Sequence, residues 1–311
     1  MTSGTIQRPL VGDSDAMRGV REYAAKIARG DSTVLLTGET GTGKENLAHF
    51  IHANSARRAR RFVCINCAAL PDGLFEGEMF GYERGAFTGA DRAYLGKLAL
   101  ADGGTVLLDE IDELSASAQA KLLRVLESHE VFRLGAQVER TIDIRVIAAT
   151  NQDLEQLTEQ RRFRRDLFFR LNVARVHVPP LRTRCEDIPA LIAHYIAEMS
   201  SRTGTHIGEL APAALDCLLR YHWPGNVREL RNVVEALFID PHEERIEIAQ
   251  LPPNLAPMLT RARESASSER ERIVSALCAT SWNKCRAAEQ LHFSRMTLYR
   301  KMAKYGIGVP R

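Results

Sequence analysis

The sequence predicts an α/β domain, followed by a helical region and a small helical domain at the C-terminal end. Residues 33–45, TVLLTGETGTGKE, read as a buried strand, a glycine-rich turn and the start of a helix. Residues 106–108 and 144–149 are further apolar runs of strand length, and each run ends in polar residues. After Pro179 and Pro180 the apolar residues recur at helical spacing instead. These observations place the strands in the first part of the chain and helices in the rest.

The glycine-rich turn predicts a phosphate-binding loop. Glycines adopt backbone angles closed to other residues, so the N–H groups of the turn and the positive end of a helix can point at one anion. The turn consists of Gly38, Glu39, Thr40, Gly41, Thr42, Gly43 and Lys44. Lys44 adds a mobile charge for the outer phosphates, and Glu45 stands where a magnesium-binding Ser or Thr is usual. Glu45 either supplies part of the metal's ligands or leaves the metal to other groups. An ordinary glycine-rich turn is the alternative to nucleotide binding.

Charge and cysteine content narrow the class of protein. The chain has 311 residues, enough for two or three domains. Its net charge is +3, but residues 261–311 hold 11 Lys+Arg against 4 Asp+Glu, a net of +7, which leaves −4 for residues 1–260. A basic tail on a slightly acidic body favours a nucleic-acid-binding module. The six cysteines form no disulfide or zinc pattern and no apolar run has the length of a membrane span, so we expect a cytoplasmic protein.

Polar side chains stand at the ends of three predicted strands. Asn66 follows residues 61–65, Asp109 and Glu110 follow residues 106–108, and Thr150 and Asn151 follow residues 144–149. Beside a phosphate loop, Asp109 would hold Mg²⁺ through water, and Glu110 would orient or deprotonate an attacking water. Thr150 and Asn151 either sense the terminal phosphate or cap the next helix. Asn66 caps a turn in the plainer interpretation.

Residues 85–90, GAFTGA, follow neither a helical nor a strand period. They are Gly85, Ala86, Phe87, Thr88, Gly89 and Ala90. Two interpretations stay open. Phe87 folds back into the core from a hairpin, or a mobile loop presents Phe87 and Thr88 to a partner.

Residues 161–170, RRFRRDLFFR, combine arginine with apolar residues. A run of this kind is usually a solvated face or a nucleic-acid patch. Here the apolar residues interleave with Arg164 and Arg170, so we expect a packed segment with its arginines on one side. The planar guanidinium suits the phosphate oxygens of a partner's nucleotide.

Three helix-patterned segments follow, at residues 188–201, 211–220 and 227–238. The tight turn WPGN, residues 223–226, starts the last of them and places Arg228 in its first turn. A cation is unfavourable at the N-terminus of a helix, so Arg228 is predicted to have an anionic partner.

The basic tail predicts a helix–turn–helix. A proline-containing connector spans residues 243–262, one helix is predicted for 270–278, and two more for 284–290 and 294–305. Ser294 is predicted to cap the last helix. The candidate DNA-binding residues are Ser294, Arg295, Thr297, Tyr299, Arg300 and Lys301. A small helical dimerisation tail is the alternative, and the charge of +7 favours DNA.

Together these motifs resemble the AAA+ activators of sigma-54 RNA polymerase, the bacterial enhancer-binding proteins, over residues 10–307. The most specific mark is GAFTGA, which other AAA+ ATPases lack. GETGTGKE, FVCINCAAL, GGTVLLDE, FRRDLFFRLNV, PPLRTRCEDI and WPGNVRELRN are also similar to the family, where an acid at the position of Glu45 is usual. The resemblance implies an AAA+ P-loop NTPase with a parallel sheet core and a helical lid. The expected segments are a flexible arm (1–9), the α/β ATPase part (10–178), the lid (179–243), a linker (244–268) and a Fis-type DNA-binding domain (269–311).

The resemblance also implies roles for residues around the nucleotide. Lys44 would bind the β- and γ-phosphates of ATP, Asp109 the Mg²⁺ and Glu110 the attacking water. Asn66 would hold Glu110 until ATP is sensed. Thr150 and Asn151 would form the first sensor and Arg228 the second.

A ring of subunits, expected to be a hexamer, follows from the resemblance. Arg164 and Arg170 would be arginine fingers that reach the ATP of a neighbouring subunit. Phe87 and Thr88 would touch the sigma factor, while the tail binds upstream DNA. Loss of the γ-phosphate would release Asn66 and Glu110, move the GAFTGA loop and remodel the closed promoter complex into an open one.

Two features depart from the family pattern. The turn of the DNA-binding domain usually carries a glycine where this chain has His292. Most relatives carry a receiver or ligand-sensing domain before the ATPase, but only residues 1–9 precede Leu10. Regulation in trans by another protein, constitutive activity and truncation all stay open.

Two rival functions stay open as well. One is a chaperone-like or replication-type AAA+ ATPase without sigma contact, against which GAFTGA argues. The other is a DNA-binding regulator whose ATP site controls only its oligomeric state.

Overall fold

A computed structural model of the chain describes residues 9–69, 72–241, 245–252, 255, 270, 273–277, 280, 283–291 and 293–307. The predicted arm (1–9) and linker (244–268) lie mostly outside these residues, and His292 lies outside them entirely. The chain divides into two compact units: Met1–His206 with His222–Ile239, and Ile207–Tyr221 with Asp240–Arg311.

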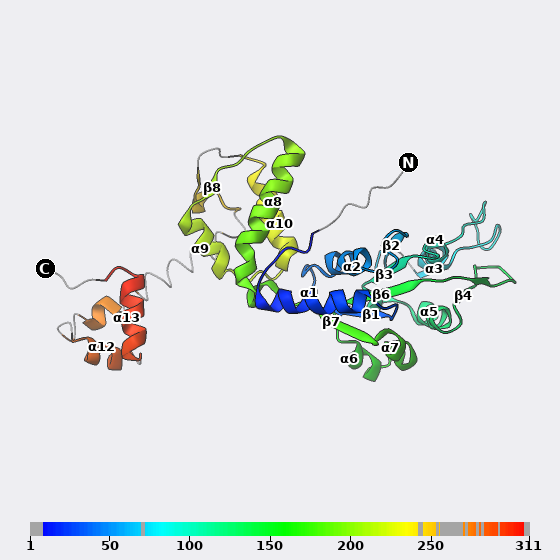
Figure 1. The fold of residues 1–311 in the computed structure, drawn as a ribbon, viewed down its shortest axis with the longest axis horizontal. Coiled ribbons are helices and arrows are strands. Elements are labelled where there is room, and N and C mark those ends of the chain that lie inside the picture. Colours follow the sequence, from blue (N-terminus) through cyan, green and yellow to red (C-terminus); the bar gives the residue numbers. More distant parts are fainter. Residues whose placement is uncertain are drawn as a thin grey trace. The chain divides into compact units, whose positions relative to one another are not determined.

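The first unit is built on a parallel five-stranded sheet (Figure 1). Its strands are β1 (Val34–Thr37), β2 (Phe62–Asn66), β3 (Thr105–Asp109), β6 (Arg145–Thr150) and β7 (Ala174–His177), in the order β2-β3-β6-β1-β7. Every neighbouring pair is parallel, so the carboxyl ends of all five strands lie at one edge. The predicted α/β fold is confirmed. The sequence had given no prediction for β7.

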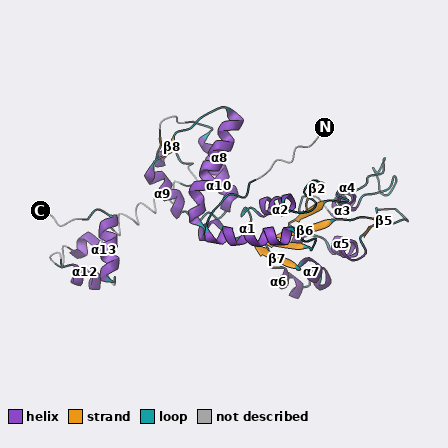
Figure 2. Cartoon of the chain, in the orientation of Figure 1, coloured by secondary structure: helices purple, strands orange, loops and turns teal. Residues whose placement is uncertain are grey.

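Helices cover both faces of this sheet (Figure 2). Successive side chains of a strand point to opposite faces. On β1, Val34 and Leu36 therefore join the core under α1 (Asp15–Ala28) and α2 (Lys44–Ala53). Leu35 joins the opposite core, under α5 (Ala116–Ser128), α6 (Leu154–Glu159) and α7 (Arg165–Leu171).

Shorter elements complete the α/β part of the first unit. They are α3 (Asp72–Phe80), α4 (Lys97–Leu100), the 3₁₀ helix η1 (Ile111–Glu113) and the antiparallel pair β4 (Glu130–Val131) and β5 (Arg140–Thr141). The segment between α3 and α4 meets the β4–β5 hairpin, because the N–H of Glu83 donates to the carbonyl of Leu134 at 2.9 Å and the N–H of Leu134 donates to Gly81 at 2.9 Å. The predicted GAFTGA turn lies in this segment.

Two lid helices belong to the same unit. They are α8 (Ile188–Thr203) and α10 (Asn226–Leu237), which pack against each other, and the 3₁₀ helices η2 (Leu181–Thr183) and η3 (Cys185–Asp187) lead into α8. The predicted tight turn before α10 is confirmed. Trp223 is fully buried there, and its carbonyl accepts the N–H of Asn226 at 2.8 Å.

The second unit holds the remaining elements. They are α9 (Pro212–Arg220), the parallel pair β8 (Glu209–Leu210) and β9 (Arg245–Ile246), η4 (Ile248–Gln250), α12 (Lys284–Gln290) and α13 (Arg295–Lys304). Ala287 and Ala288 of α12 share a small core with Leu298 and Met302 of α13, as a helix–turn–helix requires. Among the described residues, none of the helices combines the length and the apolarity that a membrane crossing needs.

A buried polar chain ties the start of α1 to the start of the lid and to the phosphate loop. Asp187, only 1% exposed, accepts hydrogen bonds from the N–H and the hydroxyl of Ser14, both at 2.8 Å. Its carboxylate also lies 3.8 Å from the buried guanidinium of Arg184. Arg184 in turn donates to the carbonyl of Thr42 at 2.8 Å. The loop is therefore fixed through a residue that is itself fixed by Asp187.

We expect Asp187→Ala to lower the free energy of unfolding by about 3 kcal/mol or more, because it leaves the buried charge of Arg184 uncompensated. Glu155→Ala is the matched control. Its pair with Arg175 has an N–O distance of 2.8 Å but is about half exposed, so we expect a loss below about 1 kcal/mol. Urea titrations can be followed by the fluorescence of buried Trp223. Equal losses for the two variants would contradict this account of Asp187.

Candidate active site

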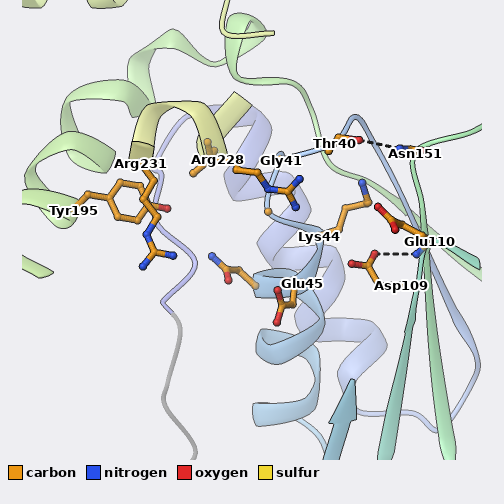
Figure 3. Close-up of a pocket in the computed structure, with 13 residues that line it drawn as sticks. Thr40, Gly41, Lys44, Glu45, Asp109, Glu110, Asn151, Tyr195, Arg228 and Arg231 are labelled. Carbon is orange, nitrogen blue, oxygen red and sulfur yellow. Dashed lines mark hydrogen bonds between the residues drawn. The ribbon is translucent and has the colours of Figure 1, made fainter. Parts of the chain in front are cut away.

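A cavity lies at the carboxyl edge of the sheet, between the phosphate loop and the lid helices (Figure 3). Its lining residues are Thr40, Gly41, Gly43, Lys44, Glu45, Asn46, Asp109, Glu110, Asn151, Tyr195, Val227, Arg228 and Arg231. The structure thus brings together Lys44, Asp109, Glu110, Asn151 and Arg228, which the sequence predicted as site residues. Gly38, Glu39 and Thr42, which were predicted to bind the cofactor, do not line the cavity.

Lys44 is held along the phosphate loop. Its side chain is largely buried, and its ammonium donates to the carbonyls of Gly38 at 2.7 Å and Glu39 at 3.1 Å. An ammonium has three donors, so one more is available for a phosphate oxygen. The two loop carbonyls therefore set the direction in which the ammonium of Lys44 can donate to that phosphate oxygen.

The charges of the cavity are not balanced by the protein alone. Burial lowers the pKa of Lys44, although the charge of Asp109 opposes this shift. Burial raises the pKa of Asp109, the charge of Glu110 adds to the rise, and Lys44 opposes it. Each shift means that the charged form lacks compensation, so an anion beside Lys44 and a cation beside Asp109 would both be favourable.

The donor set fits a magnesium ion bound with phosphates. Mg²⁺ prefers oxygen ligands and is usually held by one or two carboxylates, water and substrate phosphates. Asp109 and Glu45 both line the cavity and offer such carboxylates. No cluster of three or more metal-ligating side chains occurs among the described residues.

Glu110 adopts an unusual backbone conformation. Its φ is +56°, in the left-handed region that only glycine adopts without cost, and its N–H donates to a carboxylate oxygen of Asp109 at 3.1 Å. Such strain costs about 1–3 kcal/mol and is concentrated at functional sites. The conformation turns the Glu110 side chain out of the strand direction and into the cavity wall (Figure 3).

The two predicted sensor residues are placed differently. Asn151 lines the cavity and donates to the hydroxyl of Thr40 at 2.8 Å. Thr150 is fully buried and donates to Asp112 at 2.5 Å, so it does not reach the cavity. Adjacent residues at a strand end point to opposite sides, so Asn151 lines the cavity and Thr150 does not, and a sensing role for Thr150 stays a prediction. Thr150 instead links β6 to the turn that carries Glu110.

Three predicted catalytic residues lie outside the cavity. The carboxamide oxygen of Asn66 accepts the N–H of Ala68 at 2.8 Å, which is the turn-capping contact of the plainer interpretation. Arg164 precedes α7 and pairs with Asp166 through two hydrogen bonds, of 3.0 and 2.7 Å. Arg170 is exposed on the last turn of α7. Neither arginine lines the cavity of its own chain.

Sequence reasoning missed several residues that the lid contributes. Tyr195 and Arg231 line the cavity, with the guanidinium 5.9 Å from the centre of the ring. An aromatic ring beside a guanidinium suits stacking against a flat base. Arg231 could have been found, because it lies three residues after Arg228 and so on the same helix face. The sequence around Tyr195 carries no comparable signal.

The GAFTGA turn is closed by a hydrogen bond from the N–H of Gly85 to the carbonyl of Ala90 at 2.9 Å. Gly85 and Gly89 have φ of +82° and +97°, and an added Cβ would meet no atom at either, so the conformation alone requires glycine. Thr88 is exposed, whereas Ala90 is buried. Phe87 is 39% exposed, and its ring packs edge to face with the ring of Tyr82, with the two ring centres 4.9 Å apart. Phe87 therefore packs against Tyr82 while its side chain stays exposed, and its contact with a partner stays a prediction.

The predicted DNA-binding face lies on α13. Ser294 caps this helix as predicted, because its hydroxyl accepts the N–H of Thr297 at 3.1 Å. Tyr299 and Arg300 are exposed, while the ammonium of Lys301 lies 5.2 Å from the centre of the Phe293 ring. The side chain of Arg295 lies outside the described residues.

Comparison with known families covers nearly the whole chain. Residues 10–177 match the Sigma-54 interaction domain, residues 182–268 the AAA+ ATPase lid domain, and residues 266–305 the Bacterial regulatory protein, Fis family.

Similar proteins support the same assignment. Transcriptional regulatory protein ZraR of Klebsiella oxytoca is 42% identical over 303 residues, which cover 95% of this chain and 68% of ZraR. Nitrogen fixation protein AnfA of Azotobacter vinelandii is 42% identical over 306 residues, covering 96% of this chain and 57% of AnfA. The crystal structure of NtrX from Brucella abortus in complex with ATP is 33% identical, with a TM-score of 0.77, and covers 96% of this chain and 70% of NtrX. The chain therefore belongs to the sigma-54-dependent transcriptional activators, with an AAA+ ATPase core, a lid and a Fis-type helix–turn–helix domain.

Proposed function

We propose that this chain assembles into a ring, binds DNA upstream of promoters and uses ATP hydrolysis to convert the closed complex of sigma-54 RNA polymerase into an open one. The observation that carries the proposal is the GAFTGA turn, with two glycines in left-handed conformations and Thr88 exposed between them. A turn hinged by glycine on both sides can move as a unit against a partner.

Each cavity residue has its own role in ATP hydrolysis. Lys44 would bind the β- and γ-phosphates, and Asp109 with Glu45 would hold a Mg²⁺ ion, which would supply positive charge beside the phosphates. Glu110 orients and deprotonates the attacking water. Asn151 senses the terminal phosphate and is held by its hydrogen bond to Thr40. Arg228 is the second sensor and reaches the cavity from the lid helix α10.

A second subunit completes this site. Arg164, which precedes α7, and Arg170, in its last turn, are both exposed, and neither lines the cavity of its own chain. An arginine that stabilises the charge of the transferred phosphoryl group must touch it, so these residues act on a neighbour. Hydrolysis then requires assembly, and a ring, expected to be a hexamer, supplies each site with a neighbour.

The conformational change that starts at the γ-phosphate reaches the GAFTGA turn through the ends of β2 and β3. Asn66 and Asp109 are register partners at the ends of these strands, and the N–H of Cys67 donates to the carbonyl of Asp109 at 2.9 Å. We propose that Asn66 alternates between this turn-capping bond and Glu110, which it holds until ATP is sensed. That exchange would shift the segment that leads from β2 to the GAFTGA turn.

Hydrolysis in trans is tested by mixing two inactive variants. We expect Arg164→Ala and Glu110→Gln each to lower the ATPase rate by about a thousandfold or more. A mixture of both should regain activity, because a subunit with intact Glu110 can receive Arg164 from its neighbour. Arg165→Ala is the control, since Arg165 packs over the ring of Phe169 on the same helix. An inert mixture, or full activity of Arg164→Ala, would rule out this role.

Remodelling is tested at Thr88. We expect Thr88→Ala to hydrolyse ATP at the rate of the unchanged protein, because Thr88 is exposed on its turn and does not line the cavity. The variant should lose open-complex formation with purified sigma-54 holoenzyme, measured by the permanganate reactivity of unpaired thymines. Unchanged open-complex formation would favour a regulator that does not remodel the polymerase.

DNA binding is tested at Arg300, which is exposed on α13. We expect Arg300→Ala to weaken binding to upstream DNA and to reduce the slope of log K against log salt by about one, as loss of one phosphate contact does. The ATPase rate should not change. Arg220→Ala is the control, because Arg220 pairs with Asp216 at 2.8 Å outside the helix–turn–helix. Equal effects of the two variants on DNA binding would refute the assignment of this face.

A further inference from the structure

Glu39 is held from outside the cavity. Its carboxylate accepts two hydrogen bonds from the guanidinium of Arg182, at 2.8 and 2.5 Å, and a third from the carboxamide of Asn226 at 3.2 Å. These hydrogen bonds lower the pKa of Glu39 to about 2, so the carboxylate is charged at every physiological pH. Glu39 was predicted to bind the cofactor, but its carboxylate is bound by Arg182 of η2 and by Asn226, the first residue of α10.

The carbonyls of the next three loop residues are held in the same way. The carbonyl of Thr40 accepts from Asn226 at 3.0 Å, that of Gly41 from the N–H of Arg228 at 3.2 Å, and that of Thr42 from Arg184 at 2.8 Å. Asn226 is fully buried, and its carboxamide oxygen accepts the N–H of Leu181 at 2.8 Å. Every donor comes from the segment that starts the lid or from the start of α10.

This arrangement controls the groups that meet the phosphates. A peptide bond is planar and trans, so its C=O and the N–H of the next residue point in opposite directions. Holding the carbonyls of Thr40, Gly41 and Thr42 therefore fixes the direction of the N–H group of each following residue, and the N–H of Thr42 also donates to the carbonyl of Glu39 at 3.4 Å. Phosphate binding by a loop of this kind depends on the direction of those N–H groups.

We propose that Glu39 and Arg182 are positioning residues for nucleotide binding, which hold the phosphate loop in its binding shape without touching the nucleotide. The pair anchors the first of the four loop residues, and Asn226 joins it to the second. This inference rests on the ATPase site described above and names two residues that act on it from behind. It does not depend on the ring or on the sigma contact.

The size of the effect follows from exposure. The side chains of Glu39 and Arg182 are each 43% exposed, so the pair contributes little to the stability of the whole unit. Its loss should appear in nucleotide affinity instead. We expect the Kd for a fluorescent ADP analogue to rise about two- to fivefold, which corresponds to about 0.4–1 kcal/mol.

The test compares Glu39→Gln, Arg182→Gln and the double variant in the full chain. Both single variants should raise the Kd for the ADP analogue and the KM for ATP by the same factor, with kcat at saturating ATP changed less than about twofold. The double variant should bind the ADP analogue with the same Kd as either single variant, because the two residues act as a unit. Arg182→Lys should give a Kd between those of the unchanged protein and Arg182→Gln, since it keeps the charge but not the bidentate contact. Arg175→Gln breaks the exposed pair with Glu155 and should leave Kd and KM unchanged.

Each other outcome has a definite meaning. If Glu39 touched the nucleotide directly, Glu39→Gln would weaken binding while Arg182→Gln behaved like Arg175→Gln, and the proposal would be overturned. Additive effects in the double variant, or a fall in kcat with Kd unchanged, would overturn it too. Thermal melting of all variants identifies any general loss of folding. Failure of the unchanged protein to bind the ADP analogue would instead refute the nucleotide site itself.

Discussion

The outer carbonyls of the phosphate loop are bound by the start of the lid and by α10, and the rest of the site depends on this constraint. Arg184 holds the carbonyl of Thr42, and Asp187 holds Arg184 in turn. A Cβ on Gly41 would lie 2.3 Å from the carbonyl of Gly225, so the loop backbone and the turn before α10 are in direct contact. No flexible side chain separates them. A displacement of α10 must therefore change the loop, and a change in the loop must displace α10.

The phosphate loop and the adjacent end of β3 carry energetic costs that a bound nucleotide would reduce. Burial disfavours the charged forms of Lys44 and Asp109, and the backbone of Glu110 is strained. A phosphate beside Lys44 and a cation beside Asp109 supply the missing opposite charges. Because the ligand compensates costs that the folded chain already bears, binding stabilises the native state, by an amount that grows with ligand concentration. Because the start of the lid and α10 fix the loop backbone, the chain cannot relax to remove these costs.

Local patterns predicted the fold well, and they failed where a contact joins distant residues. Apolar runs identified β1, β3 and β6, and the cap rules identified Ser294 and the turn at Trp223. β7 was missed because ARVH alternates too briefly to be distinguished from a loop. Thr150 and Asn151 could have been separated by strand alternation alone. The partner of Glu39 could not be predicted, since Arg182 lies 143 residues away and its own segment reads only as a proline-bounded turn.

The contact between Arg164 and Asp166 shows how an arginine can be ordered and still act on a second molecule. The backbone N–H of Arg164 donates to the buried carboxamide of Gln119 at 2.9 Å, which fixes the base of the side chain. The guanidinium end pairs with Asp166, but both side chains are nearly half exposed, so water screens that pair and it contributes little to stability. A phosphate at a subunit boundary offers two-pronged binding away from water, where the same charges interact more strongly. The guanidinium can therefore leave Asp166 for such a phosphate at small cost, while its backbone stays where Gln119 holds it.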